Sequence, residues 1–228
     1  MKFNNINIFG AGNIGLNICN LIIYEGICKK INIISDQDGD FIDAIKLDFI
    51  NSPPFTSTTK ITHYFYENYP DADINIIAGG TKQNKEQLRI DLIDHKYLDT
   101  IIRNDMKGEW IVITNPDDIL ANYLLSNTSI PKDKITALGM SLDNMRAKSM
   151  GITQDILGQH NLNIYTKEET NVDHVADIPY EIIKKKGFTK YGIGYIVLWY
   201  LKYLKKYKHQ IVSRYNESKR LFESTKIK

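Results

Sequence analysis

Short apolar runs recur along the first part of the chain, and longer segments of mixed polarity separate them. A continuous apolar run is typical of a strand that is buried on both faces of a parallel sheet, and the longer segments have room for crossover helices. The pattern therefore predicts βαβ units, with helices from a glycine-rich stretch to about Tyr24 and at about 40–51. The predicted strands are 6–9, 31–35, 60–65, 74–78, 109–114 and 134–139.

The pattern changes after Gly139, where strand signals weaken and helical periodicity dominates. Gly187 is expected to separate the first two of the helices predicted there. We therefore predict an α/β fold in which residues 1–139 form a doubly wound parallel sheet and residues 140–228 form a smaller, shortened and mainly helical domain. The helices predicted in the second part are 174–186, 190–207 and 210–226.

The composition of the 228 residues is that of an ordinary globular protein, with 43% apolar and 25% charged residues. The formal net charge of +2 gives no reason to propose a nucleic-acid or membrane partner. Cys19 and Cys28 lack the spacing of a metal site, so we expect free thiols. The N-terminus lacks the pattern of a signal peptide, and the apolar run at 191–201 is too short to span a bilayer. These features predict a cytoplasmic protein.

A glycine-rich loop follows the first predicted strand directly and opens the first predicted helix, in the sequence "GAGNIG". This G-x-G-x-x-G pattern allows a tight turn, close approach of the backbone to a pyrophosphate and an anion site at the helix N-terminus. An acidic residue after the second strand can accept hydrogen bonds from an adenosine ribose and repels a 2′-phosphate. The stretch therefore predicts a Rossmann-type domain that binds NAD through Gly10, Gly12, Asn13, Ile14, Gly15 and Asp36.

Four further motifs follow the glycine loop in order: "AGGTKQNKEQLRIDL" (78–92), "ITNPDDIL" (113–120), "ALGMSLDNMR" (137–146) and "EIIKKKGFTKYGIG" (181–194). With them, the chain resembles the lactate/malate dehydrogenase family of NAD-dependent L-2-hydroxyacid dehydrogenases, and it looks closest to the lactate side. The resemblance extends to about Tyr207, and the spacing of Asp48 also fits it. It implies a small 2-oxo or 2-hydroxy acid as the substrate and a homo-oligomer, either a dimer or a tetramer.

Three residues could carry the chemistry. Arg146 is suited to hold a substrate carboxylate with two parallel hydrogen bonds. Asp143 lies three residues earlier, so that both side chains could share one helix face. The resemblance implies that Asp143 orients the imidazole of His160, which would donate the proton to the forming hydroxyl.

Other site residues are implied only by the resemblance. Arg89 matches an arginine of the family's mobile substrate loop, which would polarise the substrate carbonyl. Asn115 and Thr189 match residues that line the nicotinamide and substrate site, and Ala78 and Gly79 fall in the cofactor-binding set. Lys82 occupies the position that determines specificity, where it could favour an acidic substrate or be an ordinary loop lysine.

The motif around His160 departs from the family pattern. "LGQHNLN" keeps the glycine and the histidine, but Gln159, Asn161 and Leu162 replace the residues that the family has beside it. Fewer residues separate Asp143 from His160 than in the family. The last antiparallel strands of the family are expected to be missing, with "SRYNESKRLFESTKI" in the place of the final helix. Asp117 replaces an apolar residue.

These departures leave three functions open. The first is an active NAD-dependent 2-hydroxyacid dehydrogenase, favoured by the survival of the candidate residues in their order. The second is a catalytically impaired NAD-binding homologue, because the predicted substrate domain is reduced. The third is a malate dehydrogenase, suggested by the positive charge of Lys82.

Overall fold

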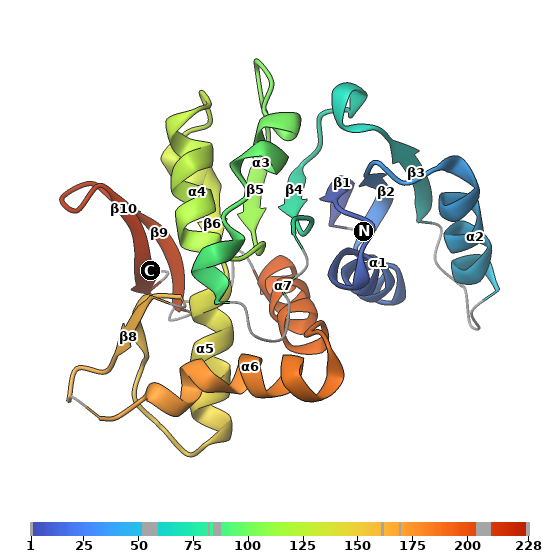
Figure 1. Cartoon of the computed structure of the whole chain (residues 1–228). Helices are drawn as coiled ribbons and strands as arrows, with labels where there is room; N and C mark the ends of the chain where they lie inside the picture. The colour runs from blue at the N-terminus through green and yellow to red at the C-terminus, as the bar shows by residue number, and fades with distance from the viewer. Residues whose placement is uncertain are drawn as a thin grey trace.

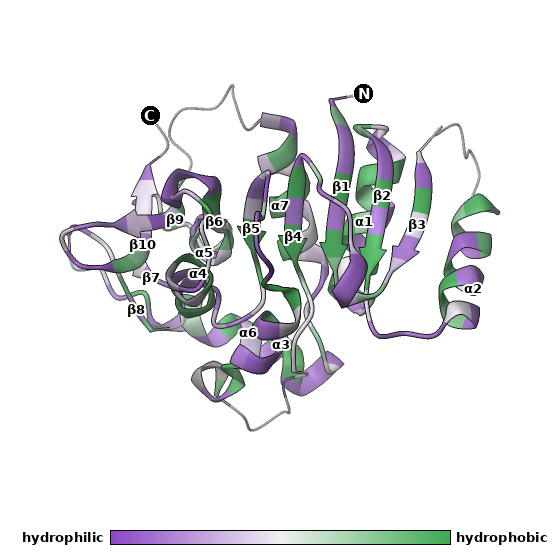
Figure 2. Ribbon diagram, turned by 90° about the horizontal axis from the view of Figure 1, so that it is seen from above, coloured by the Kyte–Doolittle hydropathy of each residue, from purple (hydrophilic) through white to green (hydrophobic). Residues whose placement is uncertain are grey.

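The computed structural model describes residues 2–51, 59–81, 83, 88–160, 162–168, 170–203 and 211–226. Six parallel strands follow the order β3-β2-β1-β4-β5-β6 across one sheet (Figure 2). This order reverses between β1 and β4, as expected for a doubly wound fold. All six strands lie where the apolar runs predict them: β1 (Phe3–Phe9), β2 (Cys28–Ile34), β3 (Lys60–Tyr64), β4 (Ile74–Ile77), β5 (Glu109–Val112) and β6 (Ile135–Ala137).

Helices cover both faces of this sheet. On one face α1 (Asn13–Glu25), α2 (Gly39–Ile50) and α7 (Tyr191–Tyr203) contribute to a single apolar cluster with the strands, and α7 lies beside α1 (Figure 1). On the other face α3 (His95–Ile101) and α4 (Asp117–Ser126) pack over Trp110 and Phe9. Burial of both faces explains why the strands read as continuous apolar runs. The described residues of this part also form three short 3-10 helices: η1 (Tyr66–Asn68), η2 (Arg89–Leu92) and η3 (Lys132–Lys134).

The segment after β6 begins with α5 (Gly139–Ser149) and a small hairpin of β7 (Leu157–Gln159) and β8 (Asn163–Tyr165). It continues with α6 (Asp173–Lys186), which ends at Gly187 in a left-handed conformation with φ of 89°. The helices α6 and α7 confirm the two predictions at 174–186 and, up to Tyr203, at 190–207. Within the described residues, no helix is long and apolar enough to cross a membrane.

The helix predicted at 210–226 is wrong. These residues form an antiparallel hairpin of β9 (Ile211–Asn216) and β10 (Leu221–Lys226), so the expected absence of final antiparallel strands is wrong as well. β9 adds to the free edge of β6 through the pair Ala137↔Ser213. Pairing with that edge overrides the helical periodicity of these residues. Arg220, with φ of 55°, forms part of the turn between β9 and β10. The sheet therefore holds strands from both sides of residue 140, and the division into two domains there remains a prediction.

Three buried asparagines form a row across the centre of the sheet. Asn32 Nδ2 donates to Asn7 Oδ1 at 2.8 Å, and Asn7 Nδ2 donates to Asn75 Oδ1 at 2.9 Å. Asn7 also donates to the carbonyl of Pro70, and Asn75 donates to that of Lys107. Buried amides are stable in a sheet only when they are hydrogen-bonded, and this row links β2, β1 and β4 through their side chains.

Candidate active site

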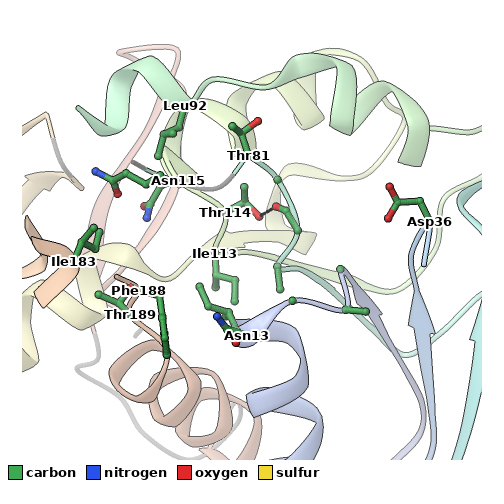
Figure 3. Close-up of a pocket in the computed structure, with 18 of the residues that line it drawn as sticks. Asn13, Asp36, Thr81, Leu92, Ile113, Thr114, Asn115, Ile183, Phe188 and Thr189 are labelled. Atoms are coloured by element: carbon green, nitrogen blue, oxygen red, sulfur yellow. Dashed lines mark hydrogen bonds between the residues drawn. The ribbon is translucent and has the colours of Figure 1, made fainter. Parts of the chain in front are cut away.

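A cavity of about 420 Å³ lies at the carboxyl ends of β1, β2, β4 and β5. In doubly wound sheets this edge is where ligands bind. Figure 3 shows Asp36 at one end of the cavity, and Asn115 and Thr189 towards the other, with Asn13 at the mouth of α1 between them. The cavity is lined by Gly10, Ala11, Gly12, Asn13, Ile14, Asp36, Gln37, Tyr66, Ala78, Gly79, Gly80, Thr81, Gln83, Leu92, Ile113, Thr114, Asn115, Ile183, Gly187, Phe188 and Thr189.

The three glycines of the loop have different physical reasons to be glycine. Gly10 has φ of 110°, and a Cβ there would lie 2.6 Å from the Gly79 Cα atom. A Cβ on Gly15 would collide with the carbonyl oxygen of Gly10, so helix and strand could not pack so closely. A Cβ on Gly12 would meet nothing within 4 Å, and Gly12 lines the cavity at the start of α1. The space beside Gly12 fits an anionic group at the helix N-terminus.

Sequence reasoning missed several residues of this cavity. Tyr66 follows β3 at the same sheet edge as Asp36, and Phe188 precedes Thr189. Burial raises the pKa of the Tyr66 phenol, although the neighbouring Tyr97 hydroxyl lowers it. Tyr66 could have been predicted as a cavity residue from its position just after a strand, because the carboxyl ends of all the parallel strands lie at one edge of the sheet.

A second group of polar side chains is buried near the β7–β8 hairpin. His160 lies in the turn of that hairpin, and its Nδ1 atom lies 2.6 Å from Asp143 Oδ2. Arg146 Nη1 donates to the other oxygen of the same carboxylate at 2.8 Å. The exposed fractions are 2% for His160, 2% for Asp143 and 8% for Arg146. One carboxylate therefore holds both the imidazole and the guanidinium in a protected environment.

Local backbone geometry places these three side chains. Asp143 and Arg146 lie three residues apart on α5, so both point to the same side of the helix. Gly158 in β7 has φ of 107°, and its Cα packs against the backbone of Asn163 so closely that only glycine fits. The glycine retained before His160 thus shapes the hairpin that carries it.

Two carboxylates that the sequence did not assign to the site bind backbone N–H groups of His160 and of Gly139. Asp118 Oδ2 accepts the backbone N–H of His160 at 2.7 Å, and Asp117 Oδ2 accepts the N–H of Gly139 at 2.6 Å. Burial raises the pKa of Asp118 to about 7. Burial also lowers the pKa of Arg146, and Asp143 opposes that shift.

The other predicted site residues either line the cavity or lie outside the part of the chain that the structure describes. Ala78, Gly79, Asn115 and Thr189 line the cavity, whereas His160, Asp143 and Arg146 do not. Asn115 stands two residues before Asp117, so one short segment joins the cavity to the buried group. Lys82 lies outside the described residues, and the side chain of Arg89, at the start of η2, does so too.

Two solved structures of lactate dehydrogenases have the same fold as this chain. One is the minor L-lactate dehydrogenase of Enterococcus mundtii, with a TM-score of 0.81 at 20% identity over 99% of this chain and 87% of that one. Another, from a deep-sea metagenome library of the Medee basin, has a TM-score of 0.80 at 19% identity over the same shares. At these identities the likeness establishes the fold.

Sequence comparison identifies relatives and a family. The L-lactate dehydrogenase of Lactobacillus helveticus is 24% identical over 82% of this chain and 70% of its own length. That of Pediococcus pentosaceus is 28% identical over 82% of this chain and 71% of its own length. The family model described as lactate/malate dehydrogenase, NAD binding domain, matches residues 4–137, which is more than half of the chain. The chain therefore belongs to the lactate/malate dehydrogenase family.

Proposed function

We propose that this protein is an NAD-dependent dehydrogenase that interconverts a small 2-oxo acid and its L-2-hydroxy acid, as an L-lactate dehydrogenase does. The observation that carries the proposal is the 2.6 Å contact between His160 Nδ1 and Asp143 Oδ2, with Arg146 on the same carboxylate. A dehydrogenase of this kind needs a hydride donor, a proton donor and a cation for the substrate carboxylate. The family membership and the L-lactate dehydrogenase relatives support the same reaction.

The cavity residues fit a dinucleotide. Gly12 leaves open space at the start of α1, where Asn13 and Ile14 also line the cavity and the free N–H groups of the helix can hold a pyrophosphate. Asp36 would accept hydrogen bonds from the adenosine ribose and would repel the 2′-phosphate of NADP. When bound, NADH supplies the hydride. We assign Asn115 and Thr189 to the nicotinamide and substrate end, since both line the opposite part of the cavity.

His160 is assigned as the proton donor. With Nδ1 protonated, the ring donates to Asp143, and the carboxylate orients the imidazole and stabilises its charged form. The other ring nitrogen, Nε2, is the atom that we assign to the substrate oxygen. Arg146 would bind the substrate carboxylate, since a guanidinium can donate two parallel hydrogen bonds. Arg89, the first residue of η2, would polarise the substrate carbonyl.

Steady-state assays of NADH oxidation test the reaction. Pyruvate, oxaloacetate and 2-oxoisocaproate are supplied to folded, NADH-saturated protein, and turnover with at least one of them is expected. Absence of turnover with all three, together with NADH binding by calorimetry, would support the catalytically impaired homologue instead.

A preference for oxaloacetate would favour malate dehydrogenase activity, the alternative that Lys82 suggests. In that case Lys82→Gln should lower the ratio of kcat/KM for oxaloacetate to that for pyruvate, because the positive charge is removed. An unchanged ratio would remove Lys82 from the explanation.

A further inference from the structure

The first turn of α4 carries two consecutive carboxylates that are both buried, Asp117 and Asp118, each 1% exposed. Side chains of this type are rarely buried without a specific partner. We propose that Asp117 and Asp118 are positioning residues for His160, and that they fix the imidazole relative to Asp143 without contacting the substrate. This inference rests on the proposed function of His160 as the proton donor.

Asp118 fixes the backbone of the histidine. Its Oδ2 atom accepts the N–H of His160 at 2.7 Å, a short hydrogen bond to a buried acceptor. The turn that carries His160 is the tip of a small hairpin, whose strands β7 and β8 are short. Such a hairpin has little rigidity of its own. An anchor from α4, a helix packed on the main sheet, therefore restrains the residue whose side chain reaches Asp143.

Asp117 fixes the surface on which the imidazole rests. Its Oδ2 atom accepts the N–H of Gly139, the first residue of α5, at 2.6 Å. A Cβ on Gly139 would fall on the His160 ring, so the ring lies directly against the Gly139 Cα atom. The same Cβ would lie 2.7 Å from Asp117 Oδ2. Asp117 therefore holds the start of the helix that carries Asp143 and, at the same point, bounds the space available to the imidazole.

Together the two carboxylates, which lie on one turn of α4, hold the two elements that carry His160 and Asp143. The backbone of His160 is held by Asp118, its ring is held by Asp143 and Gly139, and Gly139 is held by Asp117. Displacement of a reacting group by about 1 Å can cost about 100-fold in rate. Loss of either carboxylate should therefore lower kcat while the cofactor cavity stays intact.

The contact between Asp118 and His160 also depends on charge. The pKa of Asp118 is raised to about 7, mainly by burial, and the charges of Asp143 on α5 and Glu223 on β10 contribute to the rise. The Ser213 hydroxyl on β9 and the N–H of His160 lower it. A carboxylate accepts a stronger hydrogen bond than a carboxylic acid does. The hold on the His160 backbone should therefore weaken as the pH falls through neutrality.

The amide proton of His160 reports this contact directly. In the NMR spectrum of NADH-bound His160→Asn protein, whose residue 160 carries no titrating side chain, the amide resonance of residue 160 should shift with a midpoint near pH 7. Adding Asp118→Asn should abolish that transition, because the amide oxygen at position 118 still accepts the hydrogen bond but does not titrate. A His160→Asn resonance without a transition between pH 5.5 and 8.5, or the same transition after Asp118→Asn is added, would overturn the role of Asp118.

Kinetics test the positioning of the ring. Asp118→Ala and Asp117→Ala should each lower kcat about 10- to 100-fold, with NADH affinity within about twofold of wild type. Asp118→Asn and Asp117→Asn should recover most of that loss, since an amide oxygen can accept the same N–H. Asp177→Asn, at an exposed position of α6, is the matched control and should behave as wild type. Wild-type kcat in either alanine variant would remove that residue from the proposal.

The two measurements separate this inference from the proposed function. Wild-type protein that turns over none of the three oxo acids would contradict the proposed function, while the amide titration would still show whether Asp118 holds His160. If Asp118→Ala does not fold, Asp118→Asn carries the test and must abolish the amide transition of residue 160 near pH 7.

Discussion

Gly139 lies against the His160 imidazole, and the ring fits there because glycine has no side chain. In Gly139→Ala the added methyl group would occupy the position of the ring, so the imidazole must move away from Asp143. We expect kcat to fall at least about 100-fold, whereas calorimetric NADH affinity should change less than about twofold. Gly39→Ala is the matched control, because a Cβ at Gly39 meets nothing within 4 Å. Equal loss of activity in both variants would contradict this role of Gly139.

Asp118 is also expected to make stability depend on pH. Its carboxyl loses its proton near pH 3.8 in the unfolded chain and near pH 7 in the folded protein. Between these values the folded state binds more protons, so the free energy of unfolding falls as the pH rises. Asp118→Asn lacks this dependence. The free energy of unfolding of the variant minus that of the wild type should therefore increase by on the order of 2–3 kcal/mol between pH 5 and pH 8.

Urea unfolding of both proteins at the two pH values measures this difference. Groups that titrate in the same way in both proteins contribute equally to the two free energies of unfolding, so they do not affect the difference. A difference that stays constant, or that shrinks as the pH rises, would show that the buried carboxyl of Asp118 does not carry the predicted shift.

At the scale of secondary structure, Asn7 connects the asparagine row of the sheet. Asn7→Ala would leave the amide nitrogen of Asn32 and the amide oxygen of Asn75 without these partners. Unpaired buried polar groups cost about 1–3 kcal/mol each, so we expect a loss of about 2–4 kcal/mol in the free energy of unfolding. Asn5→Ala, at a half-buried position of the same strand, should cost less than about 1 kcal/mol. Similar losses in the two variants would contradict a specific role for the row.

The elements that sequence alone predicted well are those with continuous patterns. The inner strands of the parallel sheet were found because both of their faces are buried, as at Ile76 and Ile111. The β9–β10 hairpin was predicted as a helix, because its strand character comes from pairing at the edge of β6, which no local pattern encodes.

The site was predictable to a similar extent. Motifs and the family resemblance brought out Asp143, Arg146 and His160, and the structure places them in contact. Asp118 and Gly139 could not be found in that way, because their partners lie far away in sequence. Asp117 was noticed as a departure from the family pattern, but its contact with Gly139 exists only in the fold.

At the scale of the whole molecule, the fold brings the cavity and the buried group together from segments far apart in the chain. The glycine loop comes from the N-terminus, α4 and α5 from the middle, and the β7–β8 hairpin packs against β10 near the C-terminus (Figure 1). Because His160 and Arg146 are almost fully buried, a substrate that binds them as proposed must displace the residues that cover them. We therefore expect a conformational step before chemistry.

Cofactor binding should be visible in the stability of the whole molecule. A ligand at 100 times its Kd adds about 2.7 kcal/mol to the free energy of unfolding. The rise in Tm should therefore be larger with NADH than with NADPH, since Asp36 faces the cavity and repels a 2′-phosphate. Asp36→Ser should narrow the difference between the two cofactors, which thermal unfolding monitors. An equal rise in Tm for both cofactors in the wild type would contradict the assignment of Asp36.

The most direct test of the central claim compares His160→Asn with wild type in the rate of NADH oxidation, using the oxo acid that the wild type reduces best. Because asparagine cannot donate the proton as imidazolium does, kcat should fall about 100- to 10,000-fold, with NADH affinity unchanged. His174→Asn, at an exposed position of α6, is the control and should keep the wild-type rate. A His160→Asn variant that turns over as fast as wild type would contradict the assignment of His160 as the proton donor.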